Sequence, residues 1–140
     1  MVNTIIMCLA LNVYFEARNQ PLPGQVAVTQ VVLNRVADSR YPDRICDVVY
    51  QAKKTKSGKI IKNKCQFSWY CDGKSDYPTD LDAFRWATYV ALSVIYGGHK
   101  DNTFGATHYH SNKVSPDWAL PENKTAEIGD HLFFKWQGEY

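Results

Sequence analysis

Residues 3–18 of the chain, "NTIIMCLALNVYFEAR", form an apolar run that is followed by "NQPLPG" with its two prolines. On a wheel of 100° per residue, Val2, just before this run, falls in one stripe with Ile5, Ile6, Leu9 and Val13. This spacing predicts an α-helix that the prolines end. The opposite side is also apolar, so we expect the helix to pack on more than one face and to organise the fold.

Glu16 lies on the apolar stripe, near the angle of Leu9. A charged carboxylate there is costly, because burial penalises the ionised form. Three interpretations stay open. Glu16 is a structural acid partnered by Arg35 or Arg85, or it lies where the stripe reaches solvent, or it lines a cleft as a general acid with a raised pKa.

The remaining chain predicts a helical body with a small β elaboration. The spacing predicts helices over residues 25–38 and 79–98, with a short helix inside 41–51. Thr79 and Asp82 have the spacing of a capping box at the start of the last helix. Near the C-terminus, "FGATHYHS" and "HLFFKW" are short aromatic segments that we expect to pair as an antiparallel ribbon. The fold class is therefore mainly α (α+β).

Composition indicates one globular domain over residues 1–140, expected to be a monomer. The aromatic content of 14% includes nine Tyr and four Trp, which suits a groove that stacks on sugars, although a tyrosine-rich core would look the same. The net charge of +2 is too small to demand a nucleic-acid partner. The only basic stretch, "KKTKSGKIIKNK" at 53–64, is expected to be a solvated loop.

The apolar segment "IIMCLALNVYF" is short and has no basic residue before it. It predicts neither a signal peptide nor a membrane span, so no membrane insertion is expected. Of the four cysteines, Cys8 is expected to be a buried free thiol. Cys65 and Cys71 flank a short loop that a bridge to each other, or from one of them to Cys46, would close.

Several residues offer chemistry. Glycoside hydrolysis usually needs two acids, but none of the aspartates stands out as a partner for Glu16, so a single-acid mechanism in which the substrate supplies its own nucleophile is a further option. His108 and His110 point to one face of a predicted strand and could bind zinc, although no HExxH motif is present. "QFSW" offers an amide, a hydroxyl and two rings, which suit either a sugar site or the core.

Six stretches, taken in order, resemble the SleB/CwlJ family of cell-wall hydrolases. They are "NVYFEAR", "GQVAVTQVVLNRV", "YPDRICDVVYQ", "CQFSWYCDG", "GATHYHSN" and "IGDHLFF". The resemblance implies a lysozyme-like helical fold and a lytic transglycosylase that cleaves peptidoglycan glycan strands without a cofactor or metal. It also implies that Glu16 is the catalytic acid, whereas an amidase activity is the alternative, because some family members carry that label.

The resemblance implies further site residues. Those expected to line the glycan groove are Gln66, Phe67, Ser68, His108, Tyr109, His110 and Asn112. Asn34 and Arg35 also match the family, but their place on a valine-rich helix favours a structural role. The lysine-rich insert before Cys65 and the absence of a recognisable wall-binding domain depart from the family pattern.

The partner expected from these features is the peptidoglycan glycan strand at the bacterial cell wall or periplasm. The missing export signal and the short length suggest a phage endolysin made in the host cytoplasm and released by a holin, although an excised domain of a larger secreted hydrolase would look the same. Two other interpretations are kept: a zinc-dependent amidase built on His108 and His110, and a noncatalytic wall-binding module in which Glu16 is a satisfied core acid.

Overall fold

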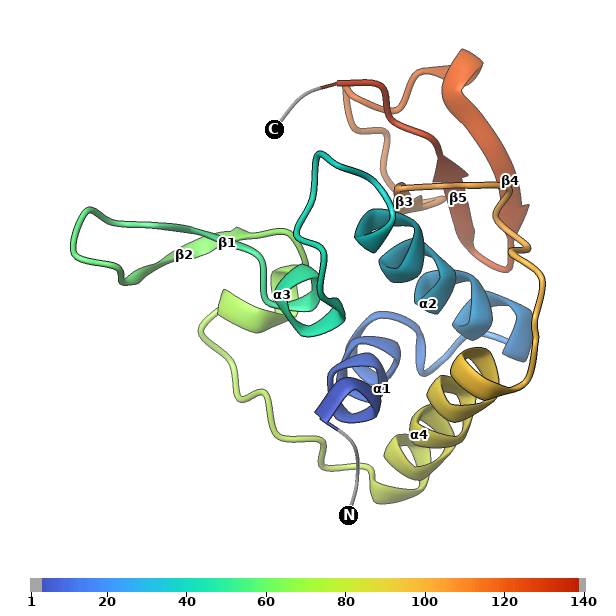
Figure 1. Ribbon diagram of the computed structural model, residues 1–140, viewed down its shortest axis with the longest axis horizontal. Coiled ribbons are helices and arrows are strands. Elements are labelled where there is room, and N and C mark those ends of the chain that lie inside the picture. Colours follow the sequence, from blue (N-terminus) through green and yellow to red (C-terminus); the bar gives the residue numbers. More distant parts are fainter. Residues whose placement is uncertain (1–3, 139–140) are drawn as a thin grey trace.

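The computed structural model of the protein describes residues 4–138, so Val2 of the predicted stripe lies outside the described residues. The helices are α1 (Thr4–Ala17), α2 (Leu22–Val36), α3 (Ile45–Val49) and α4 (Leu81–Tyr96), with 3-10 turns η1 (Ser68–Cys71) and η2 (Pro121–Asn123). The strands are β1 (Ala52–Lys54), β2 (Ile60–Cys65), β3 (His108–Ser111), β4 (Lys124–Ile128) and β5 (His131–Phe134). Figure 1 shows a helical body with a sheet beside α2 and a hairpin that extends away from the body. The mainly α fold with small antiparallel sheets is confirmed.

Helix α1 is the centre of the body, and α2, α3 and α4 all pack against it. Its buried side chains are Ile6, Cys8, Leu9, Ala10, Asn12, Val13, Tyr14 and Ala17, which surround most of the helix. The predicted packing on more than one face is therefore confirmed. Ile5 differs from the prediction, because its side chain is 40% exposed.

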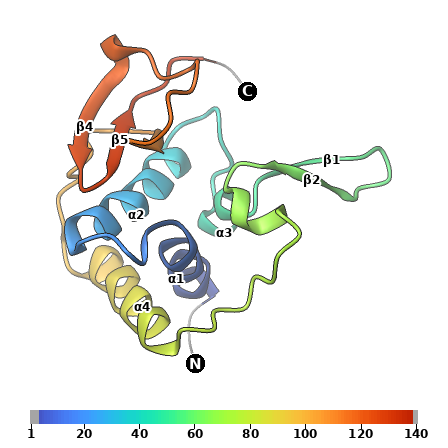
Figure 2. The ribbon, with the colours of Figure 1, turned by 180° about the vertical axis from the view of Figure 1, so that it is seen from behind.

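Helix α2 begins at Leu22, earlier than predicted. Pro21 precedes the helix as its N-cap and Pro23 lies in its first turn, where proline is tolerated because its missing N–H would have no partner inside the helix. The helix is buried on most sides, including the polar residues Gln25, Thr29 and Arg35. It lies between the three-stranded sheet and most of α1 and α4, as Figure 2 shows from behind.

The start of α4 differs from the predicted capping box by one residue. Asp80 is the N-cap, and its Oδ1 accepts a hydrogen bond from the backbone N–H of Ala83 at 3.1 Å. The backbone N–H of Asp80 donates to the Tyr14 hydroxyl at 3.0 Å. The start of α4 is thereby fixed to α1.

The predicted ribbon is present but has a third strand. β3 pairs antiparallel with β5, with His108 opposite Phe134, and β4 pairs with the other edge of β5. β4 was missed because its sequence, "KTAEI", is short and mostly polar. The basic stretch is exposed as expected, but it is not an irregular loop: β1 and β2 pair as a hairpin.

Two disulfides join the four cysteines: Cys8 with Cys46, and Cys65 with Cys71. The prediction that Cys8 is a free thiol is wrong. Helix α3 packs across α1 so closely that the Cα atoms of Cys8 and Cys46 are 5.5 Å apart, which is the spacing that a disulfide needs. This contact joins residues 38 positions apart, and helical periodicity carries no information about it.

Candidate active site

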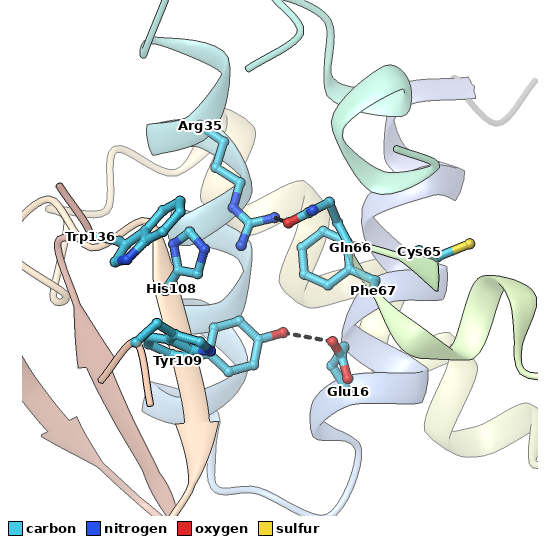
Figure 3. A pocket seen from close by; sticks show the side chains of 9 residues that line it. Glu16, Arg35, Cys65, Gln66, Phe67, His108, Tyr109 and Trp136 are labelled. Carbon is cyan, nitrogen blue, oxygen red and sulfur yellow. Dashed lines mark hydrogen bonds between the residues drawn. The ribbon is translucent and has the colours of Figure 1, made fainter. Parts of the chain in front are cut away.

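Glu16 lies in the last turn of α1, on the arc that faces the sheet, and its side chain is half-buried. Its Oε1 accepts a hydrogen bond from the Tyr109 hydroxyl at 3.0 Å (Figure 3). Burial raises the pKa of the Glu16 carboxyl, while the Tyr109 hydrogen bond and the Arg35 charge oppose that rise. Glu16 is therefore suited to hold a proton at higher pH than an exposed glutamate does.

A pocket of about 350 Å³ opens beside Glu16. Its walls come from segments far apart in the sequence: α1, α2, the segment that joins β2 to η1, β3 and two loops. The lining residues are Glu16, Arg35, Cys65, Gln66, Phe67, His108, Tyr109, Trp118 and Trp136. Four of these carry aromatic rings other than imidazole, so the pocket combines one acid with flat apolar surfaces, as sugar-binding grooves do.

Arg35 forms the wall opposite Glu16 and is only 4% exposed. Its Nε donates to the backbone carbonyl of Thr107 at 2.7 Å, and its guanidinium lies over the rings of Tyr41 and Phe67. A long hydrogen bond of 3.5 Å joins it to Gln66. The prediction of a structural role is thus correct for these contacts, but Arg35 also lines the pocket, which the sequence did not indicate.

Strand β3 presents its side chains alternately to two faces of the sheet. Tyr109 faces the helices, with its ring centroid 5.5 Å from that of Phe133, whereas His108 and His110 lie on the other face. The His108 ring lies among those of Trp118 and Trp136. Burial, with Arg35 and Arg40 nearby, lowers the pKa of His108 to about 3, so this imidazole stays neutral.

A second, smaller pocket of about 200 Å³ lies on the other side of Glu16. It is lined by Phe15, Glu16, Ala17, Arg18, Asn19, Gln20 and His131. His131 is buried, its ring packs edge-on against Tyr109, and its Nδ1 has no hydrogen-bond partner within residues 4–138. Glu16 therefore borders two pockets, which leaves room for an extended polymer to continue past the acid on both sides.

The "QFSW" segment divides between core and surface. Phe67 and Trp69 are buried, and Trp69 donates from Nε1 to Asn12 of α1 at 3.0 Å. Gln66 and Ser68 are exposed. The core interpretation is confirmed for the two rings, which anchor the segment to α1. Gln66 and Phe67 also line the pocket, and their contact with a sugar stays a prediction.

The structure brings together most of the predicted site residues. Those that line the larger pocket are Glu16, Gln66, Phe67, His108 and Tyr109. Three others do not line it. Ser68 is exposed at the start of η1, His110 packs beside Phe134 and Trp118, and Asn112 is exposed after β3.

The sequence analysis missed Trp118, Trp136 and His131. Trp118 and Trp136 lie in loops near the end of the chain, and only tertiary folding places their rings beside His108. For His131, its place within "IGDHLFF", one of the six matching stretches, was the available signal.

Within the described residues, no group of three or more His, Cys, Asp or Glu side chains is placed to hold a metal ion. His110 also uses Nδ1 for the carbonyl oxygen of Ser111, at 2.7 Å. The two predicted zinc ligands are therefore held by ring packing and local hydrogen bonds in this part of the chain.

The mainly helical fold, with one half-buried glutamate beside an aromatic-lined pocket, is the arrangement expected of the lysozyme-like class. The family model described as Cell Wall Hydrolase matches residues 19–134, and the chain belongs to that family. The matched range includes Arg35, Gln66 and Tyr109 but starts three residues after Glu16.

Curated relatives extend the match across nearly the whole chain. A spore cortex-lytic enzyme of Bacillus subtilis is 41% identical over 131 residues, which are 94% of this chain and 37% of that protein. The spore cortex-lytic enzyme of Halalkalibacterium halodurans is 31% identical over 91% of this chain and 34% of its own length. The chain therefore spans between about a third and less than half of the curated relatives that it matches.

Two solved structures match the fold. One is the catalytic domain of the germination-specific lytic transglycosylase SleB from Bacillus anthracis, with a TM-score of 0.71, 28% identity and coverage of 96% of this chain and 97% of that chain. The other is the catalytic domain of the Bacillus cereus SleB protein, with a TM-score of 0.68, 28% identity and coverage of 94% and 89%. The expected lysozyme-like fold is confirmed.

Proposed function

We propose that this chain cleaves the glycan strand of peptidoglycan as a lytic transglycosylase, with Glu16 as acid and then base. The single observation that carries the proposal is the setting of Glu16, a half-buried carboxyl with a raised pKa between two pockets. The match to SleB catalytic domains, one of them titled a lytic transglycosylase, supports the same reaction class.

The carboxylate inventory of the site favours a one-acid reaction. Among the described residues that line the two pockets, Glu16 is the only Asp or Glu. Glycosidases that use two carboxylates hold them roughly 5–10 Å apart, on either side of the scissile bond. A substrate hydroxyl that attacks within the same sugar removes the need for the second acid.

The reaction then needs two proton transfers at one carboxyl group. Protonated Glu16 gives its proton to the oxygen that leaves C1 of muramic acid, and the C1–O bond breaks. The sugar's own C6 oxygen bonds to C1, and its hydroxyl proton passes to the Glu16 carboxylate. No water is consumed, and the product is a 1,6-anhydro ring. Tyr109 and Arg35 stabilise the carboxylate formed between the two steps.

We infer that the partner is peptidoglycan and that the chain acts at the bacterial cell wall or periplasm as a monomer without a cofactor. No helix within residues 4–138 is long and apolar enough to cross a membrane. Release from a host cytoplasm by a phage holin is part of this proposal.

The test is mass spectrometry of purified peptidoglycan digested by the protein. We expect 1,6-anhydro-muramic acid ends, and Glu16→Gln should lower the rate at least about 10³-fold without unfolding the chain. Hydrated reducing ends would contradict the transglycosylase reaction, and released stem peptides would indicate an amidase. A digest in EDTA tests the zinc alternative, since the proposed reaction should proceed at an unchanged rate.

A further inference from the structure

The β1–β2 hairpin carries a concentrated positive charge that the proposed chemistry does not use. Residues 52–65 contain six lysines, Lys53, Lys54, Lys56, Lys59, Lys62 and Lys64, and no acid. The whole chain has 16 Lys and Arg against 14 Asp and Glu, so the rest of the chain has ten cations against fourteen acids, a net charge of −4. The protein is positive only because of this hairpin.

The hairpin is available to a partner. Every residue from 53 to 64 is exposed, and Figures 1 and 2 show the two strands extending away from the helical body. The three ion pairs of the described chain, Arg40–Asp38, Arg85–Asp82 and Lys124–Glu127, involve none of its lysines. Six like charges on one short hairpin repel each other, so a polyanion that lies along them would relieve that repulsion.

The base of the hairpin is part of the pocket wall. Cys65, the last residue of β2, and the adjacent Gln66 both line the pocket beside Glu16. The Cys65–Cys71 disulfide and a backbone hydrogen bond from Gln66 N to Gln51 O at 2.9 Å fix this base. A polymer that lies in the pocket therefore passes the foot of the hairpin.

We propose that the β1–β2 hairpin docks on the carboxylates of the peptide stems of peptidoglycan, on the same polymer whose glycan strand the pocket takes. This inference rests on the proposed function for the identity of the polymer. The charge of the hairpin is complementary to carboxylates repeated along a strand, and its base at the pocket wall brings it to that strand.

Other polyanions fit the hairpin less well. Residues 52–65 contain no aromatic side chain, which disfavours anchoring in a membrane interface by Trp or Tyr and disfavours stacking on nucleic-acid bases. The net negative charge of the remaining chain would also oppose a large anionic surface. A polymer whose carboxylates lie on peptide stems at the hairpin, while its uncharged glycan strand lies in the pocket, avoids that repulsion.

The test measures binding apart from turnover. The full chain with Glu16→Gln is sedimented with purified, insoluble peptidoglycan at 50 and 500 mM salt. One variant adds Lys54→Gln, Lys56→Gln and Lys59→Gln. The matched control adds Arg85→Gln, Lys100→Gln and Lys135→Gln, which remove the same charge from exposed sites outside the hairpin and both pockets. Thermal unfolding of each variant checks the fold.

We expect the hairpin variant to bind about tenfold more weakly than the control variant at 50 mM salt, and we expect this difference to disappear at 500 mM, because the contact is ionic. The chain that carries Glu16→Gln alone should bind peptidoglycan with amidated carboxylates as weakly as the hairpin variant binds native peptidoglycan. Removal of wall phosphodiester polymers with hydrofluoric acid should change nothing.

Equal binding by the hairpin and control variants would overturn the proposal. It would also fail if hydrofluoric acid treatment abolished the hairpin's contribution, or if vesicles with phosphatidylglycerol or duplex DNA showed the hairpin dependence and native peptidoglycan did not. Failure of the proposed function gives a different result, because the products of the unmodified chain would then lack anhydro ends while hairpin-dependent binding could persist.

Discussion

The hydrogen bond from Tyr109 to Glu16 stabilises the charged carboxylate and so holds its pKa below the value that burial alone would produce. Tyr109→Phe keeps the ring beside Phe133 but removes that donor. We expect the pKa of Glu16 to rise, so the alkaline limb of the kcat/KM profile, where the acid loses its proton, should move to higher pH. The rate at the optimum should fall about tenfold, because the acid is less well held.

Tyr14→Phe is the matched control for this substitution. It removes the hydroxyl of the buried Tyr14, which lines neither pocket. That hydroxyl accepts a hydrogen bond from the backbone N–H of Asp80. Its pH profile should superimpose on that of the unmodified chain. A limb that stays in place in Tyr109→Phe would show that Tyr109 does not act on the proton of Glu16.

Glu16 should also lower stability at neutral pH. Its folded-state pKa is raised above the usual 4.5, so the folded state resists the ionisation that the unfolded chain accepts, and stability falls as pH rises from about 4.5 through the folded pKa. Glu16→Gln removes this penalty. We expect a gain of roughly 0.5–2 kcal/mol in the free energy of unfolding at pH 8 and none at pH 4, measured by urea titration.

Glu122→Gln, at an exposed glutamate in η2, should change stability by less than about 0.5 kcal/mol at both pH values. A Glu16→Gln variant that is less stable at pH 8 would mean that the carboxylate is well paired, and the case for a catalytic acid would weaken.

At the scale of single residues, the sequence identified the acid but not its surroundings. Glu16 could be found because a charged residue on an apolar stripe departs from a local pattern. Tyr109 could be placed near it only through the family resemblance. Arg35, Trp118 and Trp136 meet in the pocket because α2 and two loops converge there, and that convergence depends on contacts that leave no periodic signal.

At the scale of elements, the two disulfides fasten different parts of the chain. The Cys8–Cys46 bond joins α1 to α3 across 38 residues, whereas Cys65–Cys71 closes a loop of 6. Loop-closure entropy predicts that replacing Cys8 and Cys46 by alanine lowers the free energy of unfolding by about 4 kcal/mol, and that replacing Cys65 and Cys71 lowers it by about 2 kcal/mol. Urea titration of the two double variants measures both values.

Activity should follow the opposite order. Cys65 lines the pocket and fixes the foot of the hairpin, so at a temperature where both variants are folded, loss of the Cys65–Cys71 bond should raise KM more than loss of the Cys8–Cys46 bond. Equal effects on KM would mean that η1 holds this wall without the disulfide, through Trp69 and its hydrogen bond to Asn12.

Which elements the sequence predicts depends on how local their cause is. α1, α2 and α4 follow from apolar periodicity and from proline and glycine breaks, and their ends were placed within a few residues. β4 and the hairpin were missed because their side chains are largely polar, so alternation between a core face and a solvent face is weak. The cap of α4 was misplaced because Thr79 and Asp80 are both good capping residues.

At the scale of the whole molecule, the pocket lies where the helical body, the sheet and the loops that carry Trp118 and Trp136 meet. His108 is at this junction, and Arg35 and Arg40 are the charged groups that act on it. Its folded-state pKa of about 3 lies below the usual 6.5, so its contribution to stability is complete above pH 6.5 and is lost as pH falls toward 3. Burial also lowers the pKa of His131, so this imidazole has the same effect on stability as His108.

As pH falls, the lowered pKa values of His108 and His131 decrease stability, whereas the raised pKa of Glu16 increases it. Acid conditions increase the protonated fraction of Glu16 but favour unfolding, because the unfolded chain binds protons that the buried imidazoles do not. Thermal unfolding between pH 7 and 4.5 should therefore show a falling midpoint, with His108 responsible for up to about 2–3 kcal/mol of the loss. His108→Phe, which keeps a ring among the tryptophans, should flatten this dependence, whereas His99→Gln at an exposed histidine should leave it unchanged. If His108→Phe loses stability as steeply as the unmodified chain, then other groups set the acid limit, and the junction does not bound the pH range in which Glu16 can work.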